Sequence, residues 1–236
     1  YTALDLTGRI ATAKRRAVHL WTAGGAFAMG IGVWSMHFIG MLAFKLPISL
    51  GYDISITALS LLIAVLSCGF ALWLVSQPKL PAWQLAFGAL IMGAGISAMH
   101  YTGMAAMRMQ PGIDYDPTLF GASLLIAVGA SAAALWIAFR LRQHSPYVRL
   151  FRAGAAIVMG VAIVGMHYTG MAAARFPDGS FCGAALSGLN GNGLDNLVLI
   201  TTLAVLAIAL LTSILDARLE ARTADLAHSL TVANRE

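Results

Sequence analysis

One short pattern of methionine, histidine and glycine occurs three times in this chain. The copies read MHFIGM at residues 36–41, MHYTGM at residues 99–104 and MHYTGM at residues 166–171, which places them 63 and 67 residues apart. Each copy offers an imidazole and two thioethers, which are ligands for soft and borderline transition metals. The candidate ligands are His37, His100, His167, Met36, Met99, Met166, Met41, Met104 and Met171. Such repetition indicates one structural unit used three times.

The spacing within each copy suits a helix. A histidine and the methionine four residues later lie on one helical face, one turn apart. A glycine seven residues before each histidine bares the same side of the helix, where a neighbouring helix or a cofactor can approach closely. These glycines are Gly30, Gly93 and Gly160. Tyr101 and Tyr168 follow two of the histidines and can donate hydrogen bonds to a ligand or to a nearby carbonyl, whereas Phe38 in the first copy cannot.

The composition places these helices in a lipid bilayer. The chain is 59% hydrophobic and 11% charged, with a mean hydropathy of +0.78. Because about 20 helical residues cross the hydrocarbon layer, six apolar stretches are long enough to span it. They are residues 18–44, 54–76, 83–107, 119–139, 150–174 and 197–215. We therefore predict an all-α bundle of six complete transmembrane helices.

The basic residues predict the orientation of the bundle. Twelve lysines and arginines fall on the side shared by both termini, and only Lys45, Arg108 and Arg175 fall on the other side. By the positive-inside rule both ends of the chain are cytoplasmic, and the three patterns lie near the outer face. The net charge of +5 is therefore a signal of topology, and no basic patch with interleaved aromatic residues indicates nucleic-acid binding.

The same basic residues predict the depth of the histidines. Lys45, Arg108 and Arg175 each follow a pattern histidine by eight residues, or about 12 Å of helix. If they mark the outer boundary, all three histidines lie at one level inside the bilayer. No acidic residue falls within any predicted span. The imidazoles therefore lack carboxylate partners and should be neutral, which is the form that binds a metal.

Neutral imidazoles and thioethers without carboxylates favour copper, particularly Cu(I). Zinc usually recruits thiolates, carboxylates or several imidazoles, and only the last are present here. Haem with two axial imidazoles is an alternative cofactor, because the histidines come from different helices. A third interpretation is a polar packing network without any ligand.

The repeated pattern, its threefold occurrence and the topology resemble the MHYT domain, a bacterial integral-membrane sensor module, over essentially all of residues 1–222. The resemblance implies seven spans in the intact module, of which the first is represented here only by its tail, and a location in the bacterial inner membrane. It also implies copper bound by the pattern residues, including Tyr101 and Tyr168 as supporting groups, and the sensing of a diatomic gas such as O2, CO or NO. The first copy departs from the family at Phe38 and Ile39.

The domain organisation follows from these elements. We expect a remnant of a preceding helix at residues 1–16, the membrane sensor domain at residues 17–216 and a cytoplasmic connector at residues 217–236. Apolar residues at Leu219, Leu226 and Ala233 have the spacing of a short parallel coiled coil, which favours a homodimer. By the resemblance, this connector leads to GGDEF and EAL domains, which make and degrade cyclic di-GMP. The chain itself shows no catalytic constellation and is expected to be a sensor rather than an enzyme.

Two other function classes remain open. One is a haem-binding membrane redox protein, which an optical spectrum would reveal. The other is a copper transporter, which requires ligands at several depths. Met29, Met92 and Met159 lie about 12 Å deeper than the histidines and would provide such ligands.

Overall fold

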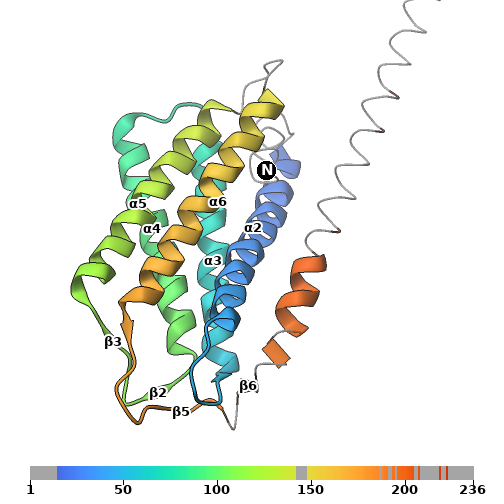
Figure 1. Ribbon diagram of the computed structural model, residues 1–236. Coiled ribbons are helices and arrows are strands. Elements are labelled where there is room, and N and C mark those ends of the chain that lie inside the picture. Colours follow the sequence, from blue (N-terminus) through green and yellow to red (C-terminus); the bar gives the residue numbers. More distant parts are fainter. Residues whose placement is uncertain are drawn as a thin grey trace, which may run out of the picture.

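The computed structural model describes residues 15–141, 148–185, 188–190, 193–194 and 196–204, with three single residues beyond them. Five long helices in these segments lie side by side in one bundle (Figure 1). They are α2 (Arg15–Ala43), α3 (Ile54–Val75), α4 (Ala82–Ala105), α5 (Pro117–Arg140) and α6 (Val148–Ala173).

All five helices can cross a membrane. Each contains an apolar stretch of 21 to 24 residues. Large apolar side chains cover the outside of the bundle, including Leu125 at 75% exposure and Ile157 at 69%. A surface of this kind is stable against lipid but not against water. The chain is therefore a multi-pass membrane protein, and five of the six predicted spans coincide with helices that are long and apolar enough to cross the bilayer.

The sixth predicted span, residues 197–215, extends past the described residues. Of this segment the structure describes residues 197–204, which are helical, and single residues further on. The predicted boundaries at residues 1–16 and 217–236, and the coiled-coil seam in the connector, also lie outside the described residues.

The three helices that carry the repeated pattern meet at the centre of the bundle. Each of α2, α4 and α6 contacts the other two. Helix α3 packs against α2 and α4, and α5 packs against α4 and α6, so both fill outer positions between pattern helices. The bundle is therefore organised around an axis that the three repeats share.

Two of the glycines predicted to bare a helix surface do so against a neighbouring helix. A Cβ built on Gly30 would lie 2.7 Å from Val65 of α3, and one on Gly93 would lie 2.7 Å from Val128 of α5. These glycines allow close packing within the first two helix pairs. Around Gly160, no atom of the described residues lies within 4 Å of the corresponding position.

Helices α3 and α5 begin in the same way. Asp53 accepts hydrogen bonds from the backbone N–H groups of Ser55 and Ile56 at 3.0 and 3.1 Å. Asp116 accepts from Thr118 and Leu119 at the same two distances. A carboxylate in this position satisfies N–H groups that have no partner within the helix. The repeat thus extends beyond the histidine pattern to the start of the following helix.

Short antiparallel strands cover the end of the bundle where the pattern helices finish (Figure 1). The pairs are β1 (Gly51–Tyr52) with β6 (Leu189–Asn190), β2 (Met109–Gln110) with β5 (Phe181–Cys182), and β3 (Asp114–Tyr115) with β4 (Ala174–Arg175). Each pair joins segments that are far apart in the sequence. Together they tie the connections between the helices into a cap above the histidines.

Candidate metal centre

The three pattern histidines converge on one point inside the bundle. The Nδ1 atom of His37 lies 3.0 Å from Nδ1 of His100 and 3.2 Å from Nδ1 of His167. One ring nitrogen from each histidine lies within 4.8 Å of the others. Each imidazole is 1% exposed. The prediction that the histidines share one level is confirmed, and the three copies build one centre rather than three.

The rings pack edge to face around the axis. Their centroids are 4.8 to 5.1 Å apart, and the planes of each pair meet at 80° to 89°. This arrangement turns the Nδ1 edges inward and the Nε2 edges toward the surrounding helices. The Nδ1 atom of His37 thus lies within hydrogen-bond distance of the Nδ1 atoms of both other histidines.

The glycine within each pattern makes this packing possible. A Cβ at Gly40 would collide with Nε2 of His167, one at Gly103 with Nε2 of His37, and one at Gly170 with Nε2 of His100. Each histidine therefore rests on the bare backbone of the next pattern helix, and the three contacts form a closed ring. The sequence analysis selected Gly30, Gly93 and Gly160 instead and overlooked these three, although their place in the repeated pattern was a visible signal.

Hydrogen bonding within the cluster cannot satisfy all the ring nitrogens. The Nδ1 atom of His37 faces both other Nδ1 atoms, but a neutral nitrogen carries either one proton or one lone pair there. The Nε2 atoms of all three rings have no hydrogen-bond partner among the described residues. Each unsatisfied buried group costs about 1–3 kcal/mol. A packing network without a ligand therefore leaves several polar atoms unpaired.

A metal ion fits the donor set better. An ion about 2.0–2.1 Å from each of three nitrogens places those nitrogens roughly 3.3–3.6 Å apart, close to the 3.0 and 3.2 Å found here. Such an ion would engage all three Nδ1 lone pairs at once. No carboxylate takes part in the cluster of potential ligands found in the described residues. The donor set therefore suits a soft or borderline ion more than a hard one.

Five of the six pattern methionines belong to two apolar clusters of the core. Met41, Met99, Met104 and Met171 belong to a cluster that includes Trp34 and Phe38, and Met166 belongs to a cluster that includes Met92 and Ile96. Met41 and Met104 are fully buried, Met99 and Met166 are 2% exposed, and Met36 is half-buried. Because Met41, Met104 and Met171 lie one turn beyond the histidines on the same helices, their thioethers are the nearest candidates for a further ligand on that side.

The two pattern tyrosines have different environments. The hydroxyl of Tyr101 lies 2.7 Å from the hydroxyl of Ser123 on α5, and its ring stands edge-on to His100. Tyr101 therefore supports the histidine and links α4 to α5. Tyr168 is 56% exposed and points away from the centre, while its ring still contacts that of His167.

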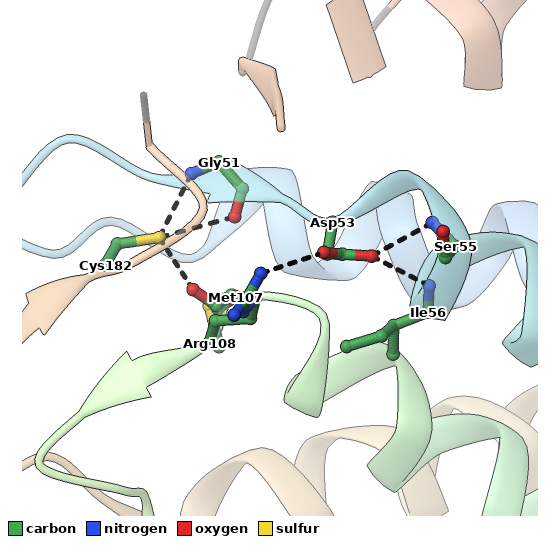
Figure 2. A network of polar contacts seen from close by, with 7 residues as sticks. All are labelled: Gly51, Asp53, Ser55, Ile56, Met107, Arg108 and Cys182. Atoms are coloured by element: carbon green, nitrogen blue, oxygen red, sulfur yellow. Dashed lines mark hydrogen bonds and ion pairs between the residues drawn. The ribbon is translucent and has the colours of Figure 1, made fainter. Parts of the chain in front are cut away.

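The cap above the centre is held by polar contacts from several loops (Figure 2). Cys182 lies 2.9 Å from the carbonyl of Met107, and the backbone N–H of Gly51 donates to its sulfur at 3.3 Å. Beside it, Arg108 pairs with the capping carboxylate of Asp53 at 3.3 Å (Figure 2). Cys68 and Cys182 are both free and buried.

Arg175 and Asp116 repeat this ion pair one unit later in the chain. The sequence analysis used Arg108 and Arg175 only as markers of membrane depth. It did not detect these pairs, because the partners are 55 and 59 residues apart and meet only in the folded bundle.

The pKa of Asp53 is lowered, mainly because its carboxylate accepts a hydrogen bond from the backbone N–H of Ile56. The N–H of Ser55 and the charge of Arg108 lower this pKa further, whereas desolvation raises it, by less than the Ile56 bond lowers it. Asp53 is thus held as a carboxylate at neutral pH. It links the start of α3 to the residue that follows α4.

Comparison with known proteins identifies one family repeat three times along the chain. The family described as "Bacterial signalling protein N terminal repeat", MHYT, matches residues 30–88, 93–150 and 160–224. The first match covers the latter part of α2 and all of α3, the second covers the latter part of α4 and all of α5, and the third begins within α6.

Curated relatives match over most or all of the chain. It is 66% identical over its full length to the bifunctional diguanylate cyclase/cyclic di-GMP phosphodiesterase MucR of Pseudomonas aeruginosa, of which it spans 34%. It is 44% identical over 73% of its length to the cyclic di-GMP phosphodiesterase NbdA of the same organism, and 36% identical over 75% to the signaling protein YkoW of Bacillus subtilis. It spans 22% of each of these two proteins. No solved structure matches the chain.

Proposed function

The chain belongs to the MHYT family of bacterial signalling proteins, and from this membership and the histidine centre we propose that it is a membrane sensor module that binds copper. His37, His100 and His167 would hold the ion through Nδ1. The observation that carries the proposal is the close approach of three buried Nδ1 atoms. Nδ1 of His37 lies 3.0 Å from that of His100 and 3.2 Å from that of His167, and the cluster of potential ligands contains no carboxylate. A bound Cu(I) would supply an electron-rich centre able to take up a small ligand.

The surroundings of the centre support Cu(I) over harder ions. Buried methionines from all three patterns pack in the two clusters beside the rings. Thioethers stabilise Cu(I) but contribute little to magnesium, calcium or zinc sites. Met41, Met104 or Met171 would supply a sulfur ligand on the outer side, and Met36, Met99 or Met166 on the inner side.

The close packing of the rings argues against haem as the cofactor. The three ring centroids lie within 5.1 Å of one another, and each Nε2 faces a glycine of the next helix. A macrocycle between two of these imidazoles would require the helices to separate. An optical spectrum of the purified protein tests this alternative, since a Soret band would support haem.

The ligand that we propose for the metal is a diatomic gas, O2, CO or NO. An apolar bilayer dissolves such molecules, and the site lies in its outer part if the predicted orientation holds. Ligand uptake would change how α2, α4 and α6 pack around the axis. We propose that the last span passes this change through residues 217–236 of a homodimer to a cyclic di-GMP domain, in keeping with the names of the relatives.

Metal analysis of the purified protein tests the copper proposal. We expect X-ray absorption to show one copper ion with nitrogen neighbours per chain. In His37→Ala the affinity for copper at this site should fall at least roughly 100-fold, because loss of a group that only supports a ligand already costs 10- to 100-fold. His100→Ala and His167→Ala should behave alike.

His19→Ala is the matched control, because His19 is an exposed histidine on the same helix as His37. It should retain the nitrogen-bound copper. Retention of this copper by the three centre variants would refute the proposal.

A further inference from the structure

A small cavity lies between the helices of the bundle, on the side of the histidines away from the cap. Its volume is about 60 Å³. All five long helices line it, which places it on the axis that the repeats share. Because no residue of the proposed histidine centre lines it except Met99, which precedes His100, the cavity is a separate feature that approaches the centre from one side.

The cavity follows the repeat in two layers. Val33, Ile96 and Ile163 lie four residues before the three histidines, and Met29, Met92 and Met159 lie eight residues before them. On a helix these positions fall one and two turns from each histidine on the same face. Met29, Met92 and Met159 therefore face the axis at one level, about 12 Å from the histidines along the helices.

Sulfur is the dominant donor around this space. Met29, Met92, Met99 and Met159 contribute thioethers, and Cys68 of α3 adds a thiol. The lining contains no charged side chain. Ser131 also lines the cavity, but no oxygen or nitrogen atom is exposed to this space, so the sulfur atoms are the donors available there. A soft ion is the kind of occupant that such donors favour.

We propose that Met29, Met92 and Met159 form a second site that binds a soft monovalent cation of the Cu+ class. Thioethers bind such ions through polarisable sulfur and do not require a counter-charge. Hard cations would lose their hydration in this cavity without gaining oxygen ligands. Methionine side chains have three rotatable bonds and can converge on an ion in a cavity of this size. The site is distinct from the histidine centre and does not depend on copper binding there.

Silver ions provide a probe of this site because Ag+ is soft, monovalent and stable to oxidation. We expect X-ray absorption of the silver-loaded protein to show a silver ion whose neighbours are sulfur atoms only, which separates it from silver at the histidine centre, where nitrogen neighbours would appear. The triple substitution Met29→Leu, Met92→Leu and Met159→Leu should abolish that signal while leaving the helix content unchanged, since exchange of methionine for leucine nearly conserves volume. A variant in which all three centre histidines are alanine should retain the signal.

The control is the pair Met107→Leu and Met109→Leu. Both residues are buried methionines outside the cavity lining. This variant should keep the sulfur-bound silver. If the wild-type protein shows no sulfur-bound silver, or if the folded triple variant retains it, the second site is wrong. If the histidine variants lose nitrogen-bound copper but keep sulfur-bound silver, the loss concerns the histidine centre and not the second site.

Discussion

At the scale of single residues, the missing side chains at Gly40, Gly103 and Gly170 matter as much as the imidazoles. A methyl group at any of them would occupy the space of an Nε2 atom from another helix. Because the three contacts form a ring, a displacement at one position shifts a histidine that belongs to a different repeat. The geometry of the centre is therefore set by backbone contacts between repeats as well as by the ligands.

We predict that Gly40→Ala disrupts the centre. The new methyl group must displace His167, and overpacking of this kind costs about 1–3 kcal/mol. The variant should lose nitrogen-bound copper and unfold at a lower temperature than the wild type. Metal analysis and thermal unfolding followed by circular dichroism measure both effects.

Gly32→Ala is the matched control on the same helix. Its Cβ would meet no described atom within 4 Å, so the substitution should only add the small helix preference of alanine. If Gly40→Ala binds copper as well as Gly32→Ala does, the glycine contact has no role in shaping the site.

At the scale of helices and strands, the repeat includes more than the histidine pattern. Asp53 and Asp116 cap α3 and α5, and each pairs with the arginine that follows the neighbouring pattern helix. The backbone N–H groups of Asp53 and Asp116 also donate to the carbonyls of Ala106 and Ala173, both at 2.8 Å. These contacts join the outer helices to the ends of the pattern helices and so help to hold the histidines at one level.

Removal of a cap should weaken the bundle. We predict that Asp116→Ala lowers the free energy of unfolding by about 1 kcal/mol, because the N–H groups of Thr118 and Leu119 lose their acceptor. Asp116→Asn should retain most of the stability, since asparagine also caps helices well. Equal losses in both variants would indicate that the ion pair with Arg175 is the main contribution.

Acid should weaken the helix-capping hydrogen bonds that Asp53 accepts at the start of α3. The pKa of Asp53 is lowered in the fold, first by the N–H of Ile56, so the stabilisation is fully present above the ordinary value of 3.8. It is lost as the pH falls through the lowered pKa, because the protonated carboxyl accepts these bonds poorly. Thermal unfolding between about pH 5 and pH 2 should therefore depend less on pH in Asp53→Asn than in the wild type. Identical pH profiles would contradict this assignment.

At the scale of the whole molecule, the two ends of the bundle formed by α2 to α6 are chemically different. The cap carries the strand pairs and both Asp–Arg pairs, whereas the opposite end carries the Lys79 turn and Arg140. By the positive-inside rule, the distribution of basic residues predicts that the cap lies outside the cell. This orientation remains a proposal, and it determines which compartment supplies the metal.

Cysteine labelling in intact cells tests the orientation. Asp178 in the cap and Lys79 at the opposite end are both exposed, so cysteines introduced there are accessible to reagents. We predict that Asp178→Cys reacts with a membrane-impermeant maleimide and that Lys79→Cys reacts only after the cells are opened. The native cysteines Cys68 and Cys182 are 5% and 7% exposed and should give little background. The reverse labelling pattern would place the centre on the cytoplasmic side.

The sequence alone was sufficient for the membrane class, five helices long and apolar enough to cross the bilayer, the three equivalent histidines and their common depth. These properties depend on local hydropathy and on helical periodicity, which neighbouring residues determine. The sequence placed the histidines at one level but did not determine whether the three patterns form one centre or three, and only the packing of the bundle brings them to one point.

Only the tertiary structure decided which groups touch within the site. The inward Nδ1 edges, the ring of contacts from His167 to Gly40 and from His37 to Gly103, and the Asp53–Arg108 pair all join residues from different helices. The rotation of each helix about its own axis sets these contacts. That rotation is fixed by close packing such as Gly30 against Val65, which no single segment of sequence specifies.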